Sequence, residues 1–266
     1  MLAFLAAPFA VLAARRALLI STTWVEVRRR YAGSLMGAAW VLMGPALLMA
    51  LYAVIYGAVL RVRPPDFAPA DYLLYVFCGL IPFLAFGEAL QLGATSLSAN
   101  KELLLNTVFP ADLVPVRAVL IAMVPAVVGL ALVLAGDAAF SHWSWHALLV
   151  PVVLVFQAAF TMGVVWVLSL ANLVVRDIQQ MLTYANMVLL IITPIAYTPS
   201  MLPEALKPLM YLNPLAYFVI SIQHLVLMNQ MPPTWIVLVG GLSSLAVFFL
   251  GHWMFRRAKL VFFDYA

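Results

Sequence analysis

The chain has 266 residues, of which 66% are apolar and only 9% are charged, and its formal net charge is +4. Soluble domains are about half apolar and about a quarter charged, so this composition excludes a water-soluble globular protein. It also excludes a disordered chain, which needs low hydrophobicity, and a nucleic-acid-binding domain. Cys78 is the one cysteine of the sequence, so a disulfide scaffold is excluded as well.

Long apolar stretches dominate the sequence. A helix needs about 20 mostly apolar residues to cross the hydrocarbon core of a bilayer, and none of these stretches has a central Lys or Arg. Transmembrane strands would show alternating polarity, which continuous apolar runs lack. We therefore predict an all-α membrane protein with six transmembrane helices. They are expected at approximately residues 35–60, 72–95, 114–136, 147–172, 180–198 and 234–255.

The distribution of Lys and Arg predicts the orientation, because cytoplasmic loops carry an excess of these residues. With a cytoplasmic N-terminus, Arg61, Arg63 and Lys207 lie outside and the rest of the 14 basic residues lie inside. This strong asymmetry predicts that both termini are cytoplasmic. The basic residues expected inside are Arg15, Arg16, Arg28, Arg29, Arg30, Lys101, Arg117, Arg176, Arg256, Arg257 and Lys259.

Residues 199–232 form an exception to the pattern of simple crossings. The apolar segment 215–228 is too short to cross, and an extra crossing would place the C-terminal basic residues outside. The pair Asn213-Pro214 is typical of a helix start, and several prolines divide the approach to it. We predict a re-entrant external helical hairpin over 199–232, before the last span. Irregular backbone at this depth needs protein or a wet cavity beside it, so we expect the hairpin to border a water-accessible path.

The N-terminal region has a different character. Met1–Ala14 is apolar, but its positive charge follows the apolar region instead of preceding it, unlike a signal peptide. Residues 15–31 then become amphipathic, which predicts an N-terminal helix lying in the cytoplasmic membrane interface. The alternative is a basic anchor that only sets the topology. The expected apolar face is Ala17, Ile20, Trp24, Val27 and Tyr31, the polar face is Arg15, Thr22, Glu26, Arg29 and Arg30, and Leu19 and Arg28 fall outside the pattern.

These features predict three regions: an interface helix region at 1–32, a transmembrane domain at 33–258 and a cytoplasmic tail at 259–266. The chain has no phosphate-binding GxxxxGK[ST] loop, no HExxH and no GxSxG motif. His142 and His146 have a spacing that could hold a metal on a helix, but their Trp-rich turn favours anchoring at the membrane interface. We therefore expect no catalytic residue, no metal site and no cofactor in this chain.

Three stretches together resemble a known family. The first, residues 28–57, has a basic and aromatic start followed by Gly37, Trp40 and Pro45. The second is the loop 98–116, and the third, residues 176–219, contains Arg176-Asp177, Thr193-Pro194-Ile195, Tyr197 and Asn213-Pro214-Leu215. In this order they cover nearly the whole chain. The sequence resembles the membrane subunit of type-2 ABC exporters, specifically the polysaccharide branch that exports O-antigen, capsular polysaccharide or teichoic acid.

The resemblance implies a multi-pass permease of the bacterial cytoplasmic (inner) membrane. Its partners would be a second copy of itself, two copies of a separate ABC ATPase that binds the ATP and Mg, membrane lipids and a lipid-linked glycan substrate, with no nucleic acid. Capsule export would add envelope-spanning periplasmic proteins. The missing GxxxxGK[ST] loop then has a reason, because nucleotide hydrolysis belongs to the ATPase.

The resemblance also implies where the functional residues lie. A coupling loop at 98–113 would contact the ATPase, with Asn100, Lys101, Glu102, Phe109 and Asp112. A substrate access region would recognise the lipid headgroup, and its basic residues could attract a diphosphate. It contains Arg28, Arg29, Arg30 and Tyr31. An external gate, formed by the hairpin and the residues just before it, would contain Pro194, Tyr197, Asn213, Pro214 and His224.

Polar and aromatic side chains within the spans are candidates for the channel lining. Glu88 is the one clear intramembrane charge, which is either functional or paired with a basic residue at the interface. Tyr52, Tyr56, Gln157 and Tyr184 are further candidates, because aromatic rings can stack on sugars. The alternative is that they belong to interfacial belts or to helix–helix hydrogen bonds.

Two other functions remain open from the sequence. The first is a type-2 ABC exporter of a drug or another small lipid-like molecule. The second is an ion-coupled carrier or a membrane-embedded glycan-modifying enzyme. Paired carboxylates or histidines near the membrane midplane would indicate the second function, and the sequence lacks them.

Overall fold

The computed structural model describes residues 2–55, 67–106, 109–139 and 144–259. Within these ranges the chain consists of helices joined by turns and contains no strand, which confirms the predicted all-α class. The α-helices are α1 (Leu2–Ala14), α2 (Arg16–Arg30), α3 (Trp40–Ala53), α4 (Pro69–Ala94), α5 (Ser96–Ala99), α6 (Lys101–Asn106), α7 (Leu113–Ala139), α8 (Val150–Val174), α9 (Ile178–Ile192), α10 (Lys207–Leu212), α11 (Pro214–Val226) and α12 (Thr234–Ala258).

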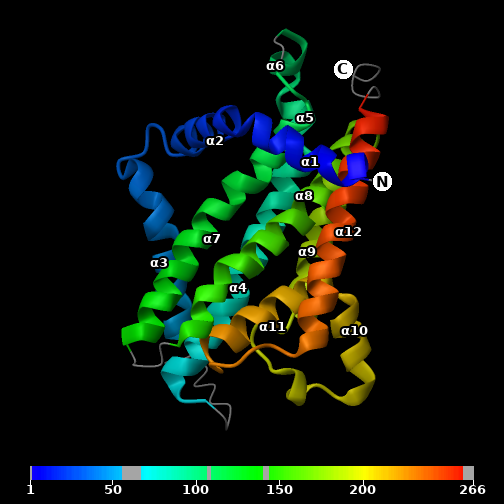
Figure 1. Ribbon diagram of the computed structural model, residues 1–266. Helices are drawn as coiled ribbons and strands as arrows, with labels where there is room; N and C mark the ends of the chain where they lie inside the picture. Colours follow the sequence, from blue (N-terminus) through cyan, green and yellow to red (C-terminus); the bar gives the residue numbers. More distant parts are fainter. Residues whose placement is uncertain (1, 56–66, 107–108, 140–143, 260–266) are drawn as a thin grey trace.

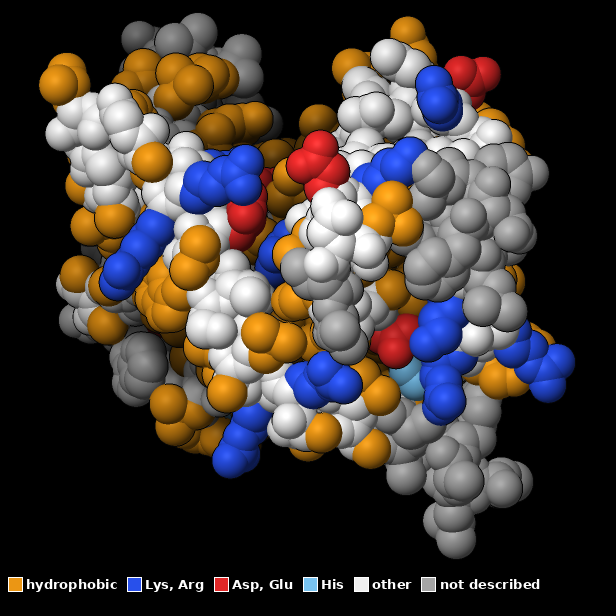
Figure 2. All heavy atoms as spheres, turned by 90° about the horizontal axis from the view of Figure 1, so that it is seen from above, with side chains coloured by type: hydrophobic (Ala, Val, Ile, Leu, Met, Phe, Trp, Pro, Cys, Tyr) orange, Lys and Arg blue, Asp and Glu red, His pale blue; other side chains and the backbone are white. Residues whose placement is uncertain are grey.

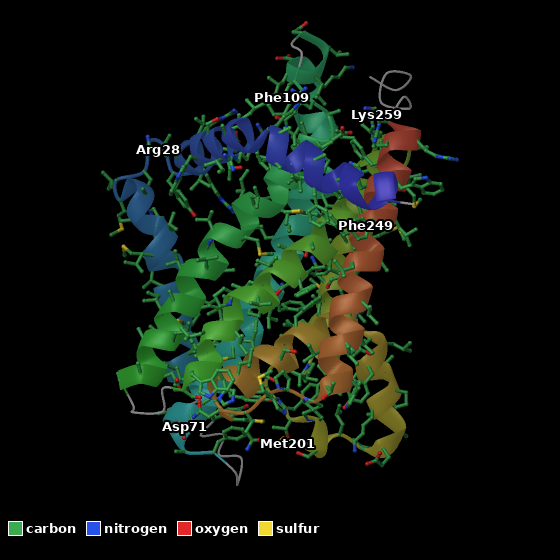
Figure 3. All side chains as sticks on the ribbon, viewed as in Figure 1. Arg28, Asp71, Phe109, Met201, Phe249 and Lys259 are labelled. Carbon is green, nitrogen blue, oxygen red and sulfur yellow. The ribbon has the colours of Figure 1, made fainter. Side chains whose placement is uncertain are left out.

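The helices form a bundle with two distinct ends (Figure 1). The helices α1, α2, α5 and α6 and the last turn of α12 lie at one end, which we call the α6 end. The opposite end, which we call the α11 end, holds α10 and α11. Figure 3 shows Arg28, Phe109 and Lys259 at the α6 end, and Asp71 and Met201 at the α11 end. The long helices run alternately between these ends, so the first helix and the end of the last helix lie on the same side.

Four helical segments of the described chain are long and apolar enough to cross a membrane: Ala70–Ala94, Leu113–Ala139, Trp145–Val174 and Thr234–Ala258. They coincide with the second, third, fourth and sixth predicted spans. The helices at the other two predicted positions are shorter, since α3 has 14 residues and α9 has 15. The first predicted span runs into residues 56–66, so its end, together with Tyr56, Arg61 and Arg63, lies outside the described residues.

The fifth predicted span is also shorter as a helix than expected, because α9 ends at Ile192 and not near residue 198. Thr193 has extended backbone, as expected for a residue that precedes a proline. Beyond it, the segments Glu204–Leu212 and Pro214–Val226 meet at 101°. At 1.5 Å per residue, the 13 residues of α11 extend about 20 Å, less than the roughly 30 Å of a hydrocarbon core. A sharply bent helical pair therefore occupies the predicted hairpin.

The residues of α2 that pack on the protein are not the same set as the apolar face predicted for the membrane interface. Leu19, Thr23 and Val27 are its buried residues, whereas Ile20 and Trp24 are 58% and 56% exposed. Leu19 was outside the predicted pattern, but it packs into a cluster with residues of α5, α7, α8 and α12. One apolar edge of α2 therefore contacts the bundle and the neighbouring edge is open to its surroundings.

The core of the bundle lies around α4, which packs against α7, α8, α9 and α11. In contrast, α3 has no buried residue in the described chain, and α9 has one, Leu182. Apolar side chains of α9 such as Met187 and Ile191 are 58% and 75% exposed. These two helices are therefore the most loosely packed of the long helices that the structure describes.

The tightest helix crossing joins α8 to α12. A Cβ added at Gly163 would overlap the backbone of Val247 and Phe248, and one added at Gly251 would overlap the backbone of Gly163. Small residues let transmembrane helices approach this closely, and close packing is a main source of their association. The two glycines thus bring the backbones of α8 and α12 into direct contact.

Replacing Gly163 by Ala should therefore lower the thermal unfolding midpoint of the detergent-purified protein. The methyl group meets backbone and not a flexible side chain, and overpacking of this kind costs about 1–3 kcal/mol. The matched control is Gly241→Ala on α12, whose added Cβ would find only Phe156 at 3.9 Å. Equal midpoints for the two variants would contradict the assigned role of this crossing.

Candidate functional site

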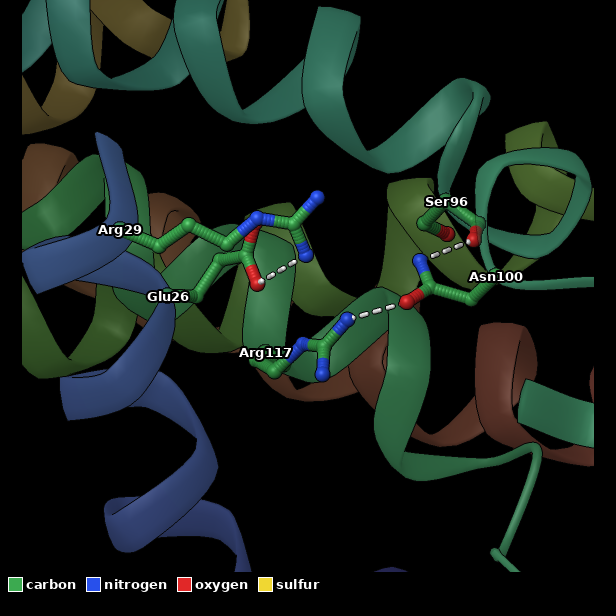
Figure 4. Close-up of polar contacts among 5 residues, drawn as sticks. All are labelled: Glu26, Arg29, Ser96, Asn100 and Arg117. Atoms are coloured by element: carbon green, nitrogen blue, oxygen red, sulfur yellow. Dashed lines mark hydrogen bonds and ion pairs between the residues drawn. The ribbon is translucent and has the colours of Figure 1, made fainter. Parts of the chain in front are cut away.

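The loop between α4 and α7 occupies the α6 end and is organised by Asn100. The backbone leaves helical geometry at this residue, which separates the short helices α5 and α6. Its side-chain amide donates to the Ser96 carbonyl at 2.8 Å, and its side-chain oxygen accepts from the Arg117 guanidinium at 2.5 Å. Figure 4 shows this chain of contacts from α5 through Asn100 to α7. The loop is thus fixed to the first turns of α7 by one carboxamide.

Beyond Asn100, the loop has an outer and an inner side. Lys101 and Glu102 are exposed on α6, whereas Leu104 is buried. Phe109 is partly buried and packs against the apolar cluster that also holds Leu19. The loop therefore contains a short helix, α6, with a charged outer surface over an apolar base.

Asp112 closes the loop by contacts with two other helices. Its backbone carbonyl accepts from the indole nitrogen of Trp166 on α8 at 3.0 Å. Its carboxylate lies 3.8 Å from the ammonium group of Lys259, just after α12. The end of the loop is therefore joined to both α8 and the C-terminal end of α12.

The basic residues that close α2 lie beside the loop at the α6 end. Arg28 is exposed, and Arg29 lies 3.9 Å from Glu26 within α2. Arg30 forms an ion pair with Glu88 of α4. Figure 2 shows basic side chains spread over this end of the molecule with acidic ones among them. Of the two possibilities for Glu88, the structure therefore shows the pairing with a basic interfacial residue.

A cavity of about 290 Å³ lies beside this ion pair. Arg30, Tyr31 and Glu88 line it together with Trp40 and with apolar residues of α3, α4 and α7. The structure thus brings three of the predicted residues, from α2 and α4, to one cavity. Arg28 and Arg29 are not among its lining residues.

The remaining channel candidates lie at separate places in the single chain. Tyr52 is partly buried on α3, with its ring centre 6.4 Å from that of Phe77. Gln157 is fully buried and donates to the Pro82 carbonyl at 2.7 Å, across the interface of α8 and α4. Tyr184 is 67% exposed on α9. The structure does not gather these three side chains, and their role in a channel stays a prediction.

At the α11 end, hydrogen bonds join two of the predicted gate residues, Asn213 and Pro194, to Thr193 and Gln223. The Asn213 amide donates to the Thr193 hydroxyl at 2.7 Å, while its oxygen accepts from the backbone of Leu215 and caps α11. Pro214 takes the first position of that helix, where its missing N–H costs nothing. The Pro194 carbonyl accepts from Gln223 at 2.9 Å. Asn213 therefore ties the start of α11 to the break after α9.

Two further gate candidates have local partners. The Tyr197 hydroxyl donates to the Ile192 carbonyl at 2.5 Å, and the Tyr197 carbonyl accepts from the Tyr75 hydroxyl at 3.2 Å. His224 contacts the Ile220 carbonyl at 3.1 Å within α11. Tyr197 thus belongs to the contact between α4 and the break after α9, whereas His224 lies further along α11.

Comparison with known proteins adds evidence that geometry alone does not provide. Residues 17–227, which include the loop at the α6 end and the bent pair at the α11 end, match the family described as ABC-2 type transporter. The chain belongs to this family. It is therefore a transport component embedded in the membrane, an ABC-2 permease.

The names of individual relatives are more specific than the family description, because they include a transported substance. The permease is 31% identical over 220 residues to a protein of Myxococcus xanthus named O-antigen export system permease protein RfbA, which covers 82% of this chain and 83% of the relative. Two proteins of the same name from Klebsiella pneumoniae are 28% and 29% identical, over 78% and 77% of this chain and 79% and 78% of their own. The similarity thus covers most of the permease and of each relative.

Several residues of these networks were not among those predicted from the sequence. Arg117 and Ser96 contact Asn100, Lys259 pairs with Asp112, and Thr193 and Gln223 hold the gate residues. The sequence carried one usable signal, since a basic residue such as Arg117 near the start of a transmembrane helix needs a partner. The pairings themselves depend on how the permease folds.

We expect the Arg30–Glu88 pair to show energetic coupling. Either charge reversal, Arg30→Glu or Glu88→Arg, should lower the unfolding midpoint, because like charges then face each other. The double reversal should regain part of the loss, and the coupling should be about 0.2–1 kcal/mol, since the side chains are 43% and 28% exposed. Arg28→Glu combined with Glu88→Arg is the control. Strict additivity of the two reversals would contradict the pair.

Proposed function

We propose that this chain is the permease subunit of an ATP-driven exporter that moves lipid-linked polysaccharide of the O-antigen class across the cytoplasmic membrane. The observation that carries the proposal is the similarity to three proteins named O-antigen export system permease, over more than three quarters of the chain. The membership in the ABC-2 family supports the transport role, and the relatives support the cargo.

The proposed topology has six membrane passages with both termini and the α6 end in the cytoplasm. Helices α3 and α9 supply the first and fifth passages. The alternating helix directions support this arrangement (Figure 1), as does the excess of Lys and Arg in the segments assigned to the cytoplasm. Helix α2, with exposed Ile20 and Trp24, then lies in the cytoplasmic interface.

The proposed partners are a second permease copy and two copies of a separate ATPase. The exposed charges of α6, over an apolar base that includes Phe109, suit a short helix that docks in a cleft of the ATPase. The hydrogen bond from Arg117 to Asn100 and the ion pair of Asp112 with Lys259 connect this loop to α7 and α12. Displacement of the loop by the ATPase would therefore act on two long helices at once.

The substrate would enter at the α6 end and leave past the α11 end. Arg28, Arg29 and Arg30 offer positive charge at the cytoplasmic surface, where a diphosphate lipid would approach. The network around Asn213 and Thr193 supports an external gate, because it joins the start of α11 to the break after α9. The apolar side chains exposed on α3 and α9 would face lipid or the second copy.

Cysteine labelling tests this topology. Cys78 is fully buried and should give little background. A membrane-impermeant maleimide should label Glu204→Cys in spheroplasts and should label Asp177→Cys only in inside-out vesicles, because the two sites lie at opposite ends of the bundle. Labelling of both sites from the same side would overturn the proposed orientation.

An export assay tests the function. Deletion of the gene should abolish surface O-antigen on immunoblots, and the wild-type gene should restore it. Alanine at Arg28, Arg29 and Arg30 should reduce export but leave copurification of the ATPase intact, because these residues contact the substrate. Glu102→Lys with Phe109→Ala should reduce export and copurification together, because both residues belong to the loop that is proposed to dock in the ATPase.

Unchanged surface O-antigen in the deletion strain would overturn the proposed cargo. Export by the purified permease without any ATPase would instead indicate an ion-coupled carrier. Full copurification of the ATPase with the loop variant would remove the coupling role of α6. Lys207→Glu at the α11 end serves as a matched charge-reversal control for the loop variant, since it lies on the opposite side of the bundle.

A further inference from the structure

A second cavity, of about 330 Å³, lies at the α6 end between α2, the turn from α4 to α5, and α7. It far exceeds the roughly 10–15 Å³ that one water needs, so it can accept a chemical group larger than water. Its polar lining consists mainly of guanidinium, carboxamide and hydroxyl groups. They belong to Arg29, Arg30, Thr95, Ser96, Asn100 and Arg117, and Glu26 adds one carboxylate.

Two of these side chains are buried and not fully satisfied. Arg117 is 8% exposed, and among the described residues its one hydrogen-bond partner is the neutral carboxamide of Asn100. No carboxylate of the described chain lies within salt-bridge distance of it. Ser96 is 4% exposed, and its hydroxyl has no hydrogen-bond partner in that part of the chain. A buried charge and a buried hydroxyl are costly without partners, so both groups favour an anionic ligand.

The charges around the cavity support the same conclusion. Glu26 is its one lining carboxylate and is shared with Arg29 at 3.9 Å. Arg30 is engaged by Glu88. Glu26 also acts electrostatically on Arg117, but it lies beyond salt-bridge distance, so the Arg117 guanidinium has no directly paired carboxylate in the described lining. Figure 4 shows Arg117 between the α2 residues and the Asn100–Ser96 contact.

We propose that this cavity binds the phosphate of a membrane lipid, with the Arg117 guanidinium and the Ser96 hydroxyl as donors. A guanidinium fork matches phosphate oxygens with two parallel hydrogen bonds. The inference rests on the proposed function for the main source of that phosphate, which is the diphosphate of the lipid-linked substrate. The phosphodiester of an ordinary phospholipid has the same chemistry and is the second source. The cavity opens beside Arg29 and Arg30, so the exposed basic residues attract the headgroup that Arg117 then holds.

Native mass spectrometry of the detergent-purified permease tests this site with undecaprenyl diphosphate as the probe. Ser96→Ala removes a hydroxyl that has no described partner, so the fold should be unchanged while the Kd rises about tenfold. Arg117→Gln should weaken binding further, and Arg117→Lys should be intermediate because it keeps the charge but loses the fork. Two control variants should bind as the wild type does. They are Ser98→Ala, at an exposed serine two residues after Ser96 on α5, and Arg256→Gln, at an exposed arginine on α12.

Asn100→Asp separates a ligand role from a structural one. A carboxylate at this position would pair with Arg117, which offsets the lost hydrogen bond to the Ser96 carbonyl, so the unfolding midpoint should stay near that of the wild type. The same carboxylate would occupy the guanidinium and repel phosphate. The site predicts a loss of lipid binding by at least about tenfold in this stable variant. A purely structural Arg117 predicts unchanged binding, and wild-type affinity in both Asn100→Asp and Ser96→Ala would overturn the proposal.

A second arm with phosphatidylglycerol distinguishes the two sources. Preference for the diphosphate lipid supports substrate recognition, and equal affinity with the same sensitivity to variants supports a phospholipid phosphate at the same site. The export assay tests the proposed function, and the binding measurements test the phosphate site, so either proposal can be contradicted without the other. Lipid binding that depends on Arg117 in a permease that is not needed for O-antigen would overturn the proposed function and leave the phosphate site standing.

Discussion

The structure depends on one constraint, which is that polar groups removed from water must find partners inside the protein. In a chain that is 66% apolar such groups are a minority. Some lie within helices, such as Gln157 and Ser244, and others lie where helices begin or end, such as Thr193 and Asn213. Asn100 joins the loop after α4 to Arg117, and Asn213 joins α11 to Thr193. Two asparagine side chains thus hold the irregular backbone at the opposite ends of the bundle.

Much of the fold could be predicted from the sequence because apolar length and proline position act locally. Four of the six predicted spans became helices of crossing length, and Pro194 and Pro214 mark the limits of the break before α11. The pairing of Glu88 with a basic residue was also one of the two possibilities considered. These outcomes follow from the cost of exposed backbone and of isolated charge in a membrane.

The pairings at the candidate site could not be predicted in the same way. The contact between Arg117 and Asn100 requires the chain to turn back over α5 and α6, and Gln157 reaches Pro82 only because α8 packs on α4. Leu19 is buried, against the helical periodicity, because its neighbours belong to other helices. Tertiary packing decides such contacts, and a single sequence carries no direct record of it.

The crossing at Gly163 and Gly251 limits which parts of the permease can move relative to each other. Because backbone lies against backbone there, α8 and α12 have no intervening side chains whose rotamers could change to let one helix slide past the other. The two helices are therefore expected to move together as one rigid unit. Any change of shape within one permease copy is therefore easier at α3 and α9, which bury few of their own residues.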